Sequence, residues 1–277
     1  MGYEFNYEEK MGTLLISDED FTRLVRFVQR NYGIDLHQKR QLIQSRLTAT
    51  IKGRGFSDFK SYVDYLLLKG SGDDINELLV KLTTNYTYFM RETDSFDYFQ
   101  KSILPQITRR KADKTLAIWS AGCSSGEEPY NITMYMMDYF GSQWGAWDTR
   151  ILATDLSLGA LEKAEKGVYQ LPENFPEQWR ESYFTPAGGR RYQVTKQVRN
   201  NVIFRQFNLM DPIQFRRKFD VIFCRNVMIY FDQPTKTALI RRFYDATVPG
   251  GYLIISLSET LPPNLPYKRV STSIFQK

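Results

Sequence analysis

The sequence predicts an α/β fold, with a doubly wound and mostly parallel sheet preceded by a small all-helical domain. Short apolar runs recur after residue 115, and turn residues bound each of them. Segments long enough for a helix separate these runs, which is the alternation typical of a parallel sheet covered by helices on both faces. Before residue 115 the apolar residues recur at helical spacing instead.

The N-terminal domain is expected to span residues 1–82. Ser17 is a predicted N-cap, and Gly33 is predicted to end the helix that follows it. A second helix is expected over about residues 38–51. A third helix is predicted in SDFKSYVDYLLLKG, with Ser57 as its cap.

A linker with a connecting helix is expected over residues 83–114, and the α/β domain over residues 115–277. Its predicted strands lie in LAIWS, RILAT, NVIFRQF, FDVIFC and GYLIIS. The segment at about residues 170–200 holds prolines, paired glycines and a QVTKQV alternation, which we interpret as an inserted β-element. The final YKRVSTSIFQK is typical of a hairpin.

Composition restricts the class of protein. Hydrophobic residues make up 42% and aromatic residues 15%, which a disordered chain does not carry. The net charge of +6 favours a polyanionic partner, whether nucleic acid, an anionic membrane surface or an acidic protein. No apolar run approaches the roughly 18 residues of a membrane span, and the N-terminus lacks a signal-peptide pattern, so a cytoplasmic protein is expected.

Cysteine and histidine are scarce in this chain. Cys123 and Cys224 lie in apolar runs, with no ligand residue at metal-binding spacing, and are predicted to be buried thiols. His37 is the one histidine. Chemistry that needs an imidazole is therefore not expected, and we expect no metal site.

A glycine-bearing turn, AGCSSGEE, follows the first predicted strand and opens a helix. Glycine allows a ligand to lie against the backbone there, and Gly122 is expected at the ligand. The spacing from Gly122 to Gly126 differs from the dinucleotide pattern, and Glu127 and Glu128 would repel phosphates. The turn therefore favours a cationic or zwitterionic ligand.

Asp155 ends the second predicted strand, where an acid can accept hydrogen bonds from the two hydroxyls of a ribose. The alternative is a surface acid that caps the helix over residues 158–166. The glycine turn and this acid together indicate a nucleoside ligand. The lack of a phosphate-binding pattern favours S-adenosylmethionine, whose sulfonium is positive.

The chain resembles the CheR family of chemotaxis receptor methyltransferases over nearly its whole length. The similar segments are NYGIDLHQKRQLIQSRL and FSDFKSYVDYL in the helical part, then TTNYTYFMRETDSF, IWSAGCSSGEEPYNITM, ILATDLSLGALEKAEKGVY, FNLMD, FDVIFCRNVMIYFD and VPGGYLIISLSETL. The resemblance implies a class I, Rossmann-like methyltransferase domain that binds S-adenosylmethionine and releases S-adenosylhomocysteine.

The resemblance also implies roles for individual residues. Arg91 would pair with the methionyl carboxylate, Glu128 would face the amino group, and Asp155 the ribose. The remaining implied cofactor-binding residues are Asn85 and Thr87 in the connecting segment, Asn208 and Leu209 beside the adenine, and Asn226 and Val227 at the methyl-bearing end. Arg225 and Tyr230 would be catalytic and would meet the substrate. Read singly, Arg91 could be a surface residue, Asn208 a turn residue and Tyr230 a core aromatic.

The implied reaction is O-methylation of glutamate side chains on the cytoplasmic domains of chemotaxis receptors, which gives glutamate methyl esters. A glutamate with a pKa near 4.3 is ionised at neutral pH, so no general base is required. Lys39, Arg40 and Arg46 in the helical domain could bind an acidic receptor helix, or could simply be a solvated face. The partners implied are receptors, through which the protein would be peripheral to the membrane, and not nucleic acid. A nucleic-acid methyltransferase and a non-catalytic regulator that binds S-adenosylmethionine are the two rival readings.

Overall fold

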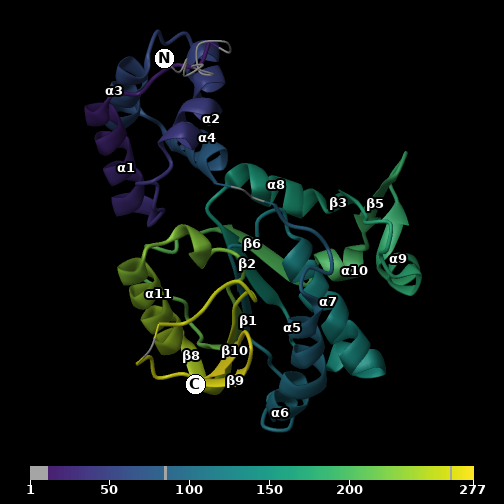
Figure 1. The fold of residues 1–277 in the computed structure, drawn as a ribbon. Coiled ribbons are helices and arrows are strands. Elements are labelled where there is room, and N and C mark those ends of the chain that lie inside the picture. The colour runs from purple at the N-terminus through teal and green to yellow at the C-terminus, as the bar shows by residue number, and fades with distance from the viewer. Residues whose placement is uncertain (1–11, 84–85, 263) are drawn as a thin grey trace, which may run out of the picture. The chain divides into compact units, whose positions relative to one another are not determined.

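The computed structural model of the chain describes residues 12–83, 86–262 and 264–277. The chain divides into two compact units, Met1–Thr84 and Asn85–Lys277 (Figure 1). In these described ranges, no helix is both long enough and apolar enough to cross a bilayer.

The smaller unit is helical, as the sequence predicts. Its helices within the described residues are α1 (Asp18–Tyr32), α2 (Arg40–Gly53), α3 (Phe59–Lys69) and α4 (Gly72–Leu82). The Ser17 side chain accepts from Asp20 N, and Gly33 takes a left-handed φ of 73°, so both predicted ends of α1 are confirmed. The prediction of Ser57 as the cap of α3 is wrong, because the Asp58 side chain accepts from Ser61 N.

A buried carboxylate ties the helices of the smaller unit together. Asp74 accepts hydrogen bonds from Ser71 N at 2.8 Å and from the Tyr65 hydroxyl at 2.7 Å, and it pairs with Arg54 at the end of α2. These donors hold the pKa of Asp74 well below its usual range. The first turn of α4 is thereby fastened to α2 and α3.

The larger unit contains a seven-stranded sheet in the order β6-β2-β1-β7-β8-β10-β9. The strands are β1 (Ile118–Ala121), β2 (Ile151–Asp155), β6 (Val202–Gln206), β7 (Phe219–Phe223), β8 (Thr247–Ile254), β9 (Lys268–Ser271) and β10 (Ile274–Gln276). The first five are mutually parallel, and β10 runs antiparallel to both β8 and β9. The predicted doubly wound sheet and its terminal hairpin are therefore confirmed.

Helices flank this sheet. The helices described in the larger unit are α5 (Thr93–Tyr98), η2 (Phe99–Ile103), α6 (Leu104–Thr108), α7 (Glu127–Phe140), η3 (Gly141–Ala146), α8 (Leu158–Lys166), α9 (Glu177–Tyr183), α10 (Lys196–Arg199), η4 (Met228–Tyr230) and α11 (Gln233–Ala246). Helices α7 and α8 pack against β2 and β6, whereas α11 packs against β8. Figure 1 shows α7 and α11 on opposite faces of the sheet.

The strand order reverses at the centre of the sheet. Ile118 of β1 is in register with Ile151 of β2 on one side and with Val221 of β7 on the other. The chain proceeds from β1 to β2 and β6 in one direction, and from β7 to β8 in the other. In sheets of this kind, ligands bind beyond the carboxyl ends of the strands at the point of reversal, which here lies between β1 and β7.

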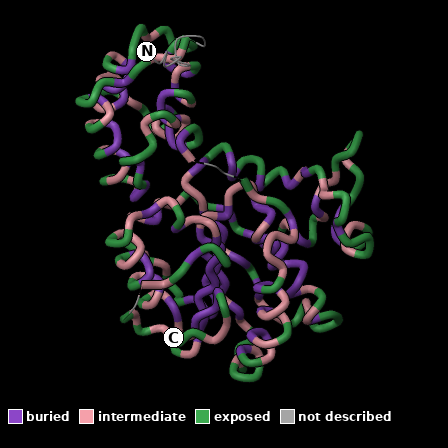
Figure 2. The backbone as a smooth tube through the Cα atoms, viewed as in Figure 1, coloured by how far each residue is buried: buried purple, intermediate pink, exposed green. Residues whose placement is uncertain are grey.

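Large apolar side chains fill the space on the faces of the central strands, where the buried stretches gather in Figure 2. Trp119 is fully buried, and its Nε1 donates to Thr154 Oγ1 at 2.9 Å. Cys123 and Cys224 are buried free thiols, as predicted, and burial raises the pKa of both. These thiols are therefore core side chains.

The inserted β-element predicted at about residues 170–200 is a three-stranded antiparallel sheet in the order β3-β5-β4. Its strands are β3 (Val168–Gln170), β4 (Phe184–Pro186) and β5 (Arg191–Val194). Phe184 of β4 packs with Phe89 and Phe175 at ring-centroid distances of 5.3 Å each. This aromatic contact fixes the insertion to the segment that precedes α5.

Candidate functional site

The turn after β1 requires glycine at two positions. A Cβ added to Gly122, which has a φ of 83°, would lie 2.4 Å from Val227 Cγ2. A Cβ added to Gly126, with a φ of 94°, would lie 2.7 Å from Ala164 Cβ. The turn thus packs against the loop after β7 on one side and against α8 on the other.

Asp155 is fixed at the carboxyl end of β2, beside this turn. Its Oδ2 accepts from Ser124 N at 2.8 Å and its Oδ1 accepts from Ser157 N at 2.9 Å. Ser157, whose Oγ accepts from Ala160 N, is the N-cap of α8, so the alternative in which Asp155 caps that helix is excluded. Burial raises the pKa of Asp155, and the backbone donors oppose that shift. The ion pairs of the described residues include none to this carboxylate.

Glu128, in the first turn of α7, faces Arg225 across the reversal point. Arg225 Nη1 lies 3.2 Å from Glu128 Oε2, and Ser120 Oγ donates to Glu128 Oε1 at 2.7 Å. Burial raises the pKa of Glu128, while the arginine and the serine lower it. The predicted cofactor residue Glu128 and the predicted catalytic residue Arg225 are thus direct partners.

Arg225 is enclosed by the segment that leads into α5. Its Nη2 donates to Arg91 O at 2.5 Å and lies 3.3 Å from Glu92 Oε2, and its guanidinium lies 4.7 Å from the centre of the Phe96 ring. The side chain is 2% exposed. Arg225 Nε is buried and has no hydrogen-bond partner among the described residues. One N–H donor of the guanidinium therefore remains unsatisfied.

Two carboxylates hold the loop that carries Asn226. Glu92 Oε1 accepts from Asn226 Nδ2 at 3.4 Å, and Glu259 Oε2 accepts from Asn226 N at 3.2 Å. Glu92 and Glu259 are site residues that the sequence analysis missed. Glu259 lies beyond the carboxyl end of β8, whereas Asp155 is the last residue of β2, and this position after a strand is the signal that could have found Glu259. Glu92 carries no such signal.

The other predicted residues of this unit lie on segments bordering the same strand ends. Arg91 Nη1 donates to Tyr86 O at 2.7 Å, and Thr87 lies half-buried in the same segment. Asn208 and the buried Leu209 follow β6, where Asn208 Oδ1 accepts from Met210 N at 3.0 Å. Tyr230 lies half-buried at the end of η4, and its N–H donates to Val227 O at 3.2 Å. Asn85 lies outside the described residues.

The basic residues predicted on the helical domain belong to the smaller unit. Arg40 donates to Ile16 O and pairs with Asp18, and Arg46 Nη1 donates to Lys81 O at 3.1 Å and to Thr83 O at 3.2 Å. Lys39 is exposed at the N-cap position of α2. Arg40 and Arg46 therefore contribute to the structure of their own unit.

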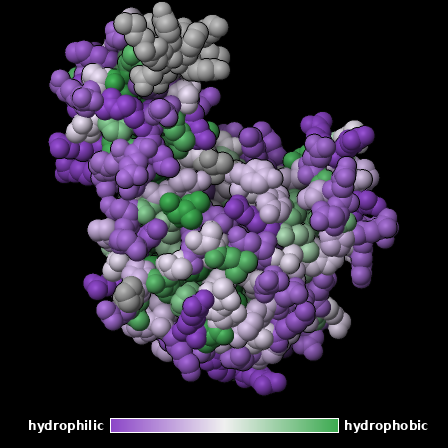
Figure 3. All heavy atoms as spheres, in the orientation of Figure 1, coloured by the Kyte–Doolittle hydropathy of each residue, from purple (hydrophilic) through white to green (hydrophobic). Residues whose placement is uncertain are grey.

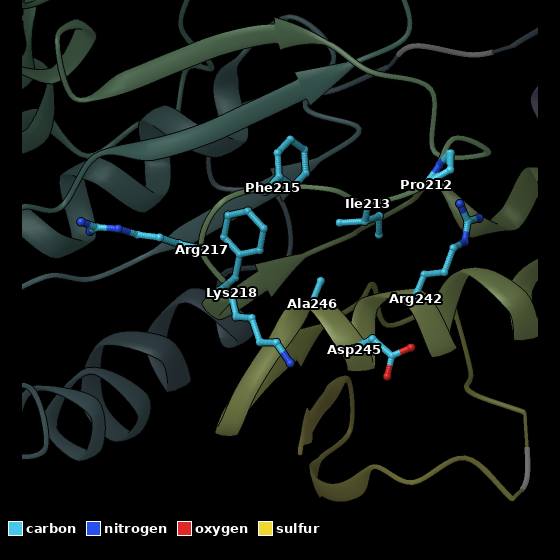
Figure 4. Close-up of a pocket in the computed structure, with 9 residues that line it drawn as sticks. Pro212, Ile213, Phe215, Arg217, Lys218, Arg242, Asp245 and Ala246 are labelled. Carbon is cyan, nitrogen blue, oxygen red and sulfur yellow. The ribbon is translucent and has the colours of Figure 1, made fainter.

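A pocket of about 280 Å³ lies at the opposite ends of the strands (Figure 4). Its wall includes Phe219 at the start of β7 and Ala246 at the end of α11, together with Lys218, Arg242 and Asp245. None of the predicted site residues lines it. The candidate site is therefore the cluster at the carboxyl ends of β1, β2, β7 and β8, and not this pocket.

Comparison with known proteins identifies the family of the chain. Residues 85–275 match the family model described as CheR methyltransferase, SAM binding domain, and residues 19–83 match CheR methyltransferase, all-alpha domain. A chemotaxis protein methyltransferase of Borreliella burgdorferi is 37% identical over 271 residues, which cover 95% of each chain. Chemotaxis protein methyltransferase 2 of Vibrio cholerae is 32% identical, over 91% of this chain and 88% of its own. The chemotaxis protein methyltransferase of Escherichia coli is 34% identical, over 89% of this chain and 86% of its own. A helical unit, a parallel sheet with a glycine turn after β1, and these matches lead to one conclusion: the chain belongs to the CheR family of S-adenosylmethionine-dependent chemotaxis methyltransferases.

Proposed function

We propose that the chain methylates glutamate side chains on the cytoplasmic domains of chemotaxis receptors, giving glutamate methyl esters and S-adenosylhomocysteine. The observation that carries this proposal is the guanidinium of Arg225. It pairs with Glu128, which follows the glycine turn after β1, and its Nε has no hydrogen-bond partner among the described residues. Glu128 and Glu92 pair with the two terminal nitrogens of this guanidinium, and its Nε remains for a substrate that arrives as a carboxylate. The chemotaxis role of the relatives supports receptors as the source of that carboxylate.

The residues of the candidate site fit S-adenosylmethionine as the cofactor. When bound, it supplies a methyl group on a positively charged sulfonium. The described ion pairs give Asp155 no cation, and this carboxylate would accept from the ribose hydroxyls. Gly122, whose Cβ would collide with Val227, allows the backbone of the turn to form the wall of the site, and Glu128 would face the amino group. Asn85, Thr87 and Arg91 would bind from the connecting segment, Asn208 and Leu209 would border the adenine, and Asn226 and Val227 would line the methyl-bearing end.

The substrate carboxylate would need alignment, and not deprotonation, because a glutamate is already ionised at neutral pH. Arg225 Nε and the Tyr230 hydroxyl would hold its two oxygens, so that a lone pair points at the methyl group. The one histidine, His37, belongs to the smaller unit, where its Nδ1 lies 2.8 Å from Asp35 Oδ1. The site residues named here include no imidazole, which agrees with a reaction that needs no base.

A protein substrate is supported by apolar side chains that reach solvent around the site. Figure 3 shows hydrophobic residues among hydrophilic ones on one face of the larger unit. Ile229 and Leu257 are each 48% exposed, although their backbone N–H groups donate to Glu259 and Glu92. These two exposed apolar side chains lie beside the candidate site, where a protein substrate would contact them.

The helical unit would assist by attracting acidic receptor helices, with Lys39 as the exposed contributor and Arg40 and Arg46 adding positive charge. Lys39→Glu should raise the Michaelis constant for receptor several-fold at low salt, and high salt should abolish the difference. Lys69→Glu, at an exposed position at the end of α3, is the matched control. Equal effects of the two variants would place receptor docking elsewhere.

The test of the proposed function is transfer of a radiolabelled methyl group to membranes that contain chemotaxis receptors. Total RNA and receptor-free membranes serve as parallel substrates. Label on the receptor alone supports the proposal. Label on RNA would favour a nucleic-acid methyltransferase, and binding of S-adenosylmethionine without label on any substrate would favour a regulator.

A further inference from the structure

Glu259 is a buried carboxylate that receives backbone hydrogen bonds from two separate strand ends. Its Oε2 accepts from Asn226 N at 3.2 Å and from Ser256 N at 3.0 Å, and its Oε1 accepts from Ile229 N at 3.2 Å. The residue is 7% exposed. The ion pairs found among the described residues include none to Glu259, so its partners are these three amides.

The Glu259 carboxylate bonds to both chain segments just beyond the point where the pairing of β7 with β8 ends. β7 and β8 are parallel neighbours up to Phe223 and Ile254, and Cys224 N still donates to Ile254 O at 2.8 Å. Beyond this point the two strands diverge, and the amides of Asn226 and Ser256 have no opposite carbonyl in the ladder. One oxygen of Glu259 accepts from both of these amides, which keeps the two chain segments together beyond the last paired residues.

The loop that Glu259 holds has a left-handed residue and carries site residues. Asn226 has a φ of 59°, in the left-handed region that asparagine enters more readily than other residues apart from glycine. Val227, the next residue, packs against Gly122 in the cofactor turn. Tyr230 is tied to Val227 through the 3.2 Å bond from its N–H to Val227 O. A change at the Asn226 backbone is therefore expected to reach Val227 and, through it, Tyr230.

We infer that Glu259 is a positioning residue for methyl transfer, which fixes the loop from Arg225 to Tyr230 in the conformation that aligns the substrate carboxylate. Its charge matters because a carboxylate accepts at both oxygens, whereas the amide of glutamine accepts at one and presents N–H groups at the other. In Glu259→Gln, either the Ile229 amide or the pair from Asn226 and Ser256 would therefore meet a donor. This inference rests on the proposed function in one respect, which is that kcat is measured with a receptor substrate.

The experiment compares Glu259→Gln and Glu259→Asp with Asp220→Asn as the matched control. Asp220, like Glu259, is a buried acid. It lies at the amino end of β7, where it accepts from Ala117 N at 2.9 Å and pairs with Lys111. Each variant is measured for kcat on receptor membranes, for affinity towards S-adenosylhomocysteine, and for hydrogen–deuterium exchange of the peptide spanning residues 225–231. Exchange requires no substrate, so it separates this inference from the proposed function.

We expect Glu259→Gln to lower kcat by about 10- to 100-fold, the scale of a lost hydrogen bond to a charged group. Exchange in residues 225–231 should accelerate, and Glu259→Asp, which keeps the charge but retracts the oxygens, should show an intermediate loss. Asp220→Asn should change neither kcat nor exchange in that peptide. The inference is overturned if Glu259→Asp and Glu259→Gln keep the exchange rate and the kcat of the wild type. It is also overturned if their loss of kcat is no larger than that of Asp220→Asn. If the wild type itself labels no receptor, the proposed function fails, whereas unchanged exchange in residues 225–231 refutes the role of Glu259.

Discussion

Arg225 at the end of β7 and Glu128 at the start of α7 form an ion pair, with 3.2 Å between Nη1 and Oε2. The pair spans the point where the strand order reverses, which is where this class of sheet binds its ligand. Both side chains are nearly enclosed, at 2% and 12% exposure. The ion pair therefore links the β7 side of the candidate site directly to its α7 side.

Glu128→Gln should lower the free energy of unfolding by up to about 3 kcal/mol, because among the described residues it leaves the buried guanidinium of Arg225 with Glu92 as its one charged partner. Urea titration measures this loss. Glu177→Gln, which breaks an exposed pair with Arg180, is the control and should leave the unfolding midpoint unchanged. Equal stability of Glu128→Gln and the wild type would mean that the pair contributes nothing to the fold.

Asp155→Asn should weaken S-adenosylhomocysteine binding by about 10- to 100-fold, because hydrogen bonds from the ribose would lose their charged acceptor. The Ser124 and Ser157 amides also lose that charge, so calorimetric titration is paired with a thermal melt to confirm folding. Asp148→Asn, which precedes the other end of β2 and pairs with Arg150, is the control. An affinity equal to that of the wild type would remove Asp155 from the cofactor site.

Tyr230→Phe should reduce kcat about tenfold and leave affinity for S-adenosylhomocysteine within about twofold of wild type, because its proposed partner is the substrate carboxylate. Single-turnover transfer and calorimetry measure the two quantities. Tyr244→Phe on α11 removes a hydroxyl from a ring that packs against Tyr267 and serves as the control. If affinity and turnover fall together, Tyr230 belongs to the cofactor site.

The fold was largely readable from sequence because each strand of the parallel sheet is a short apolar run with its own turn residues. Gly122 and Asp155 could be placed for the same reason, since the carboxyl end of a strand determines where the next residue lies. The hydrogen bonds from Asn226 to Glu92 and Glu259 could not be predicted, although the position of Glu259 after β8 placed it near the same edge of the sheet. Glu92 and Glu259 lie far from Asn226 in the chain, and a glutamate read alone suggests a solvated surface. The enclosure of Arg225 was missed because its partners come from two segments far away in the chain, the run around Arg91 and Glu92 and the start of α7.

Glu127 gives the protein a pH dependence opposite in sign to that of most carboxylates. Burial raises its pKa to about 6 in the folded state, above the ordinary value of 4.5. The folded protein therefore holds this proton more tightly than the unfolded chain, and its contribution to stability falls as pH rises from about 4.5 to about 6. The loss is about 2 kcal/mol at most.

Glu127→Gln has no charge to develop over this range, so its stability relative to wild type should increase between pH 4.5 and pH 6 and stay constant above it. Urea unfolding at a series of pH values from about 4 to 8 gives the difference curve. Parallel curves for the two proteins would show that Glu127 titrates normally.

The most direct test of the account concerns the bond that is made. Receptor labelled with radioactive methyl by the wild-type protein is treated with mild alkali, which hydrolyses a carboxyl methyl ester to volatile methanol but leaves N-methyl groups intact. We predict that the label is released as methanol, and that replacing the modified receptor glutamates by alanine prevents labelling. Label that survives alkali, or that persists on a receptor without those glutamates, would contradict O-methylation of glutamate.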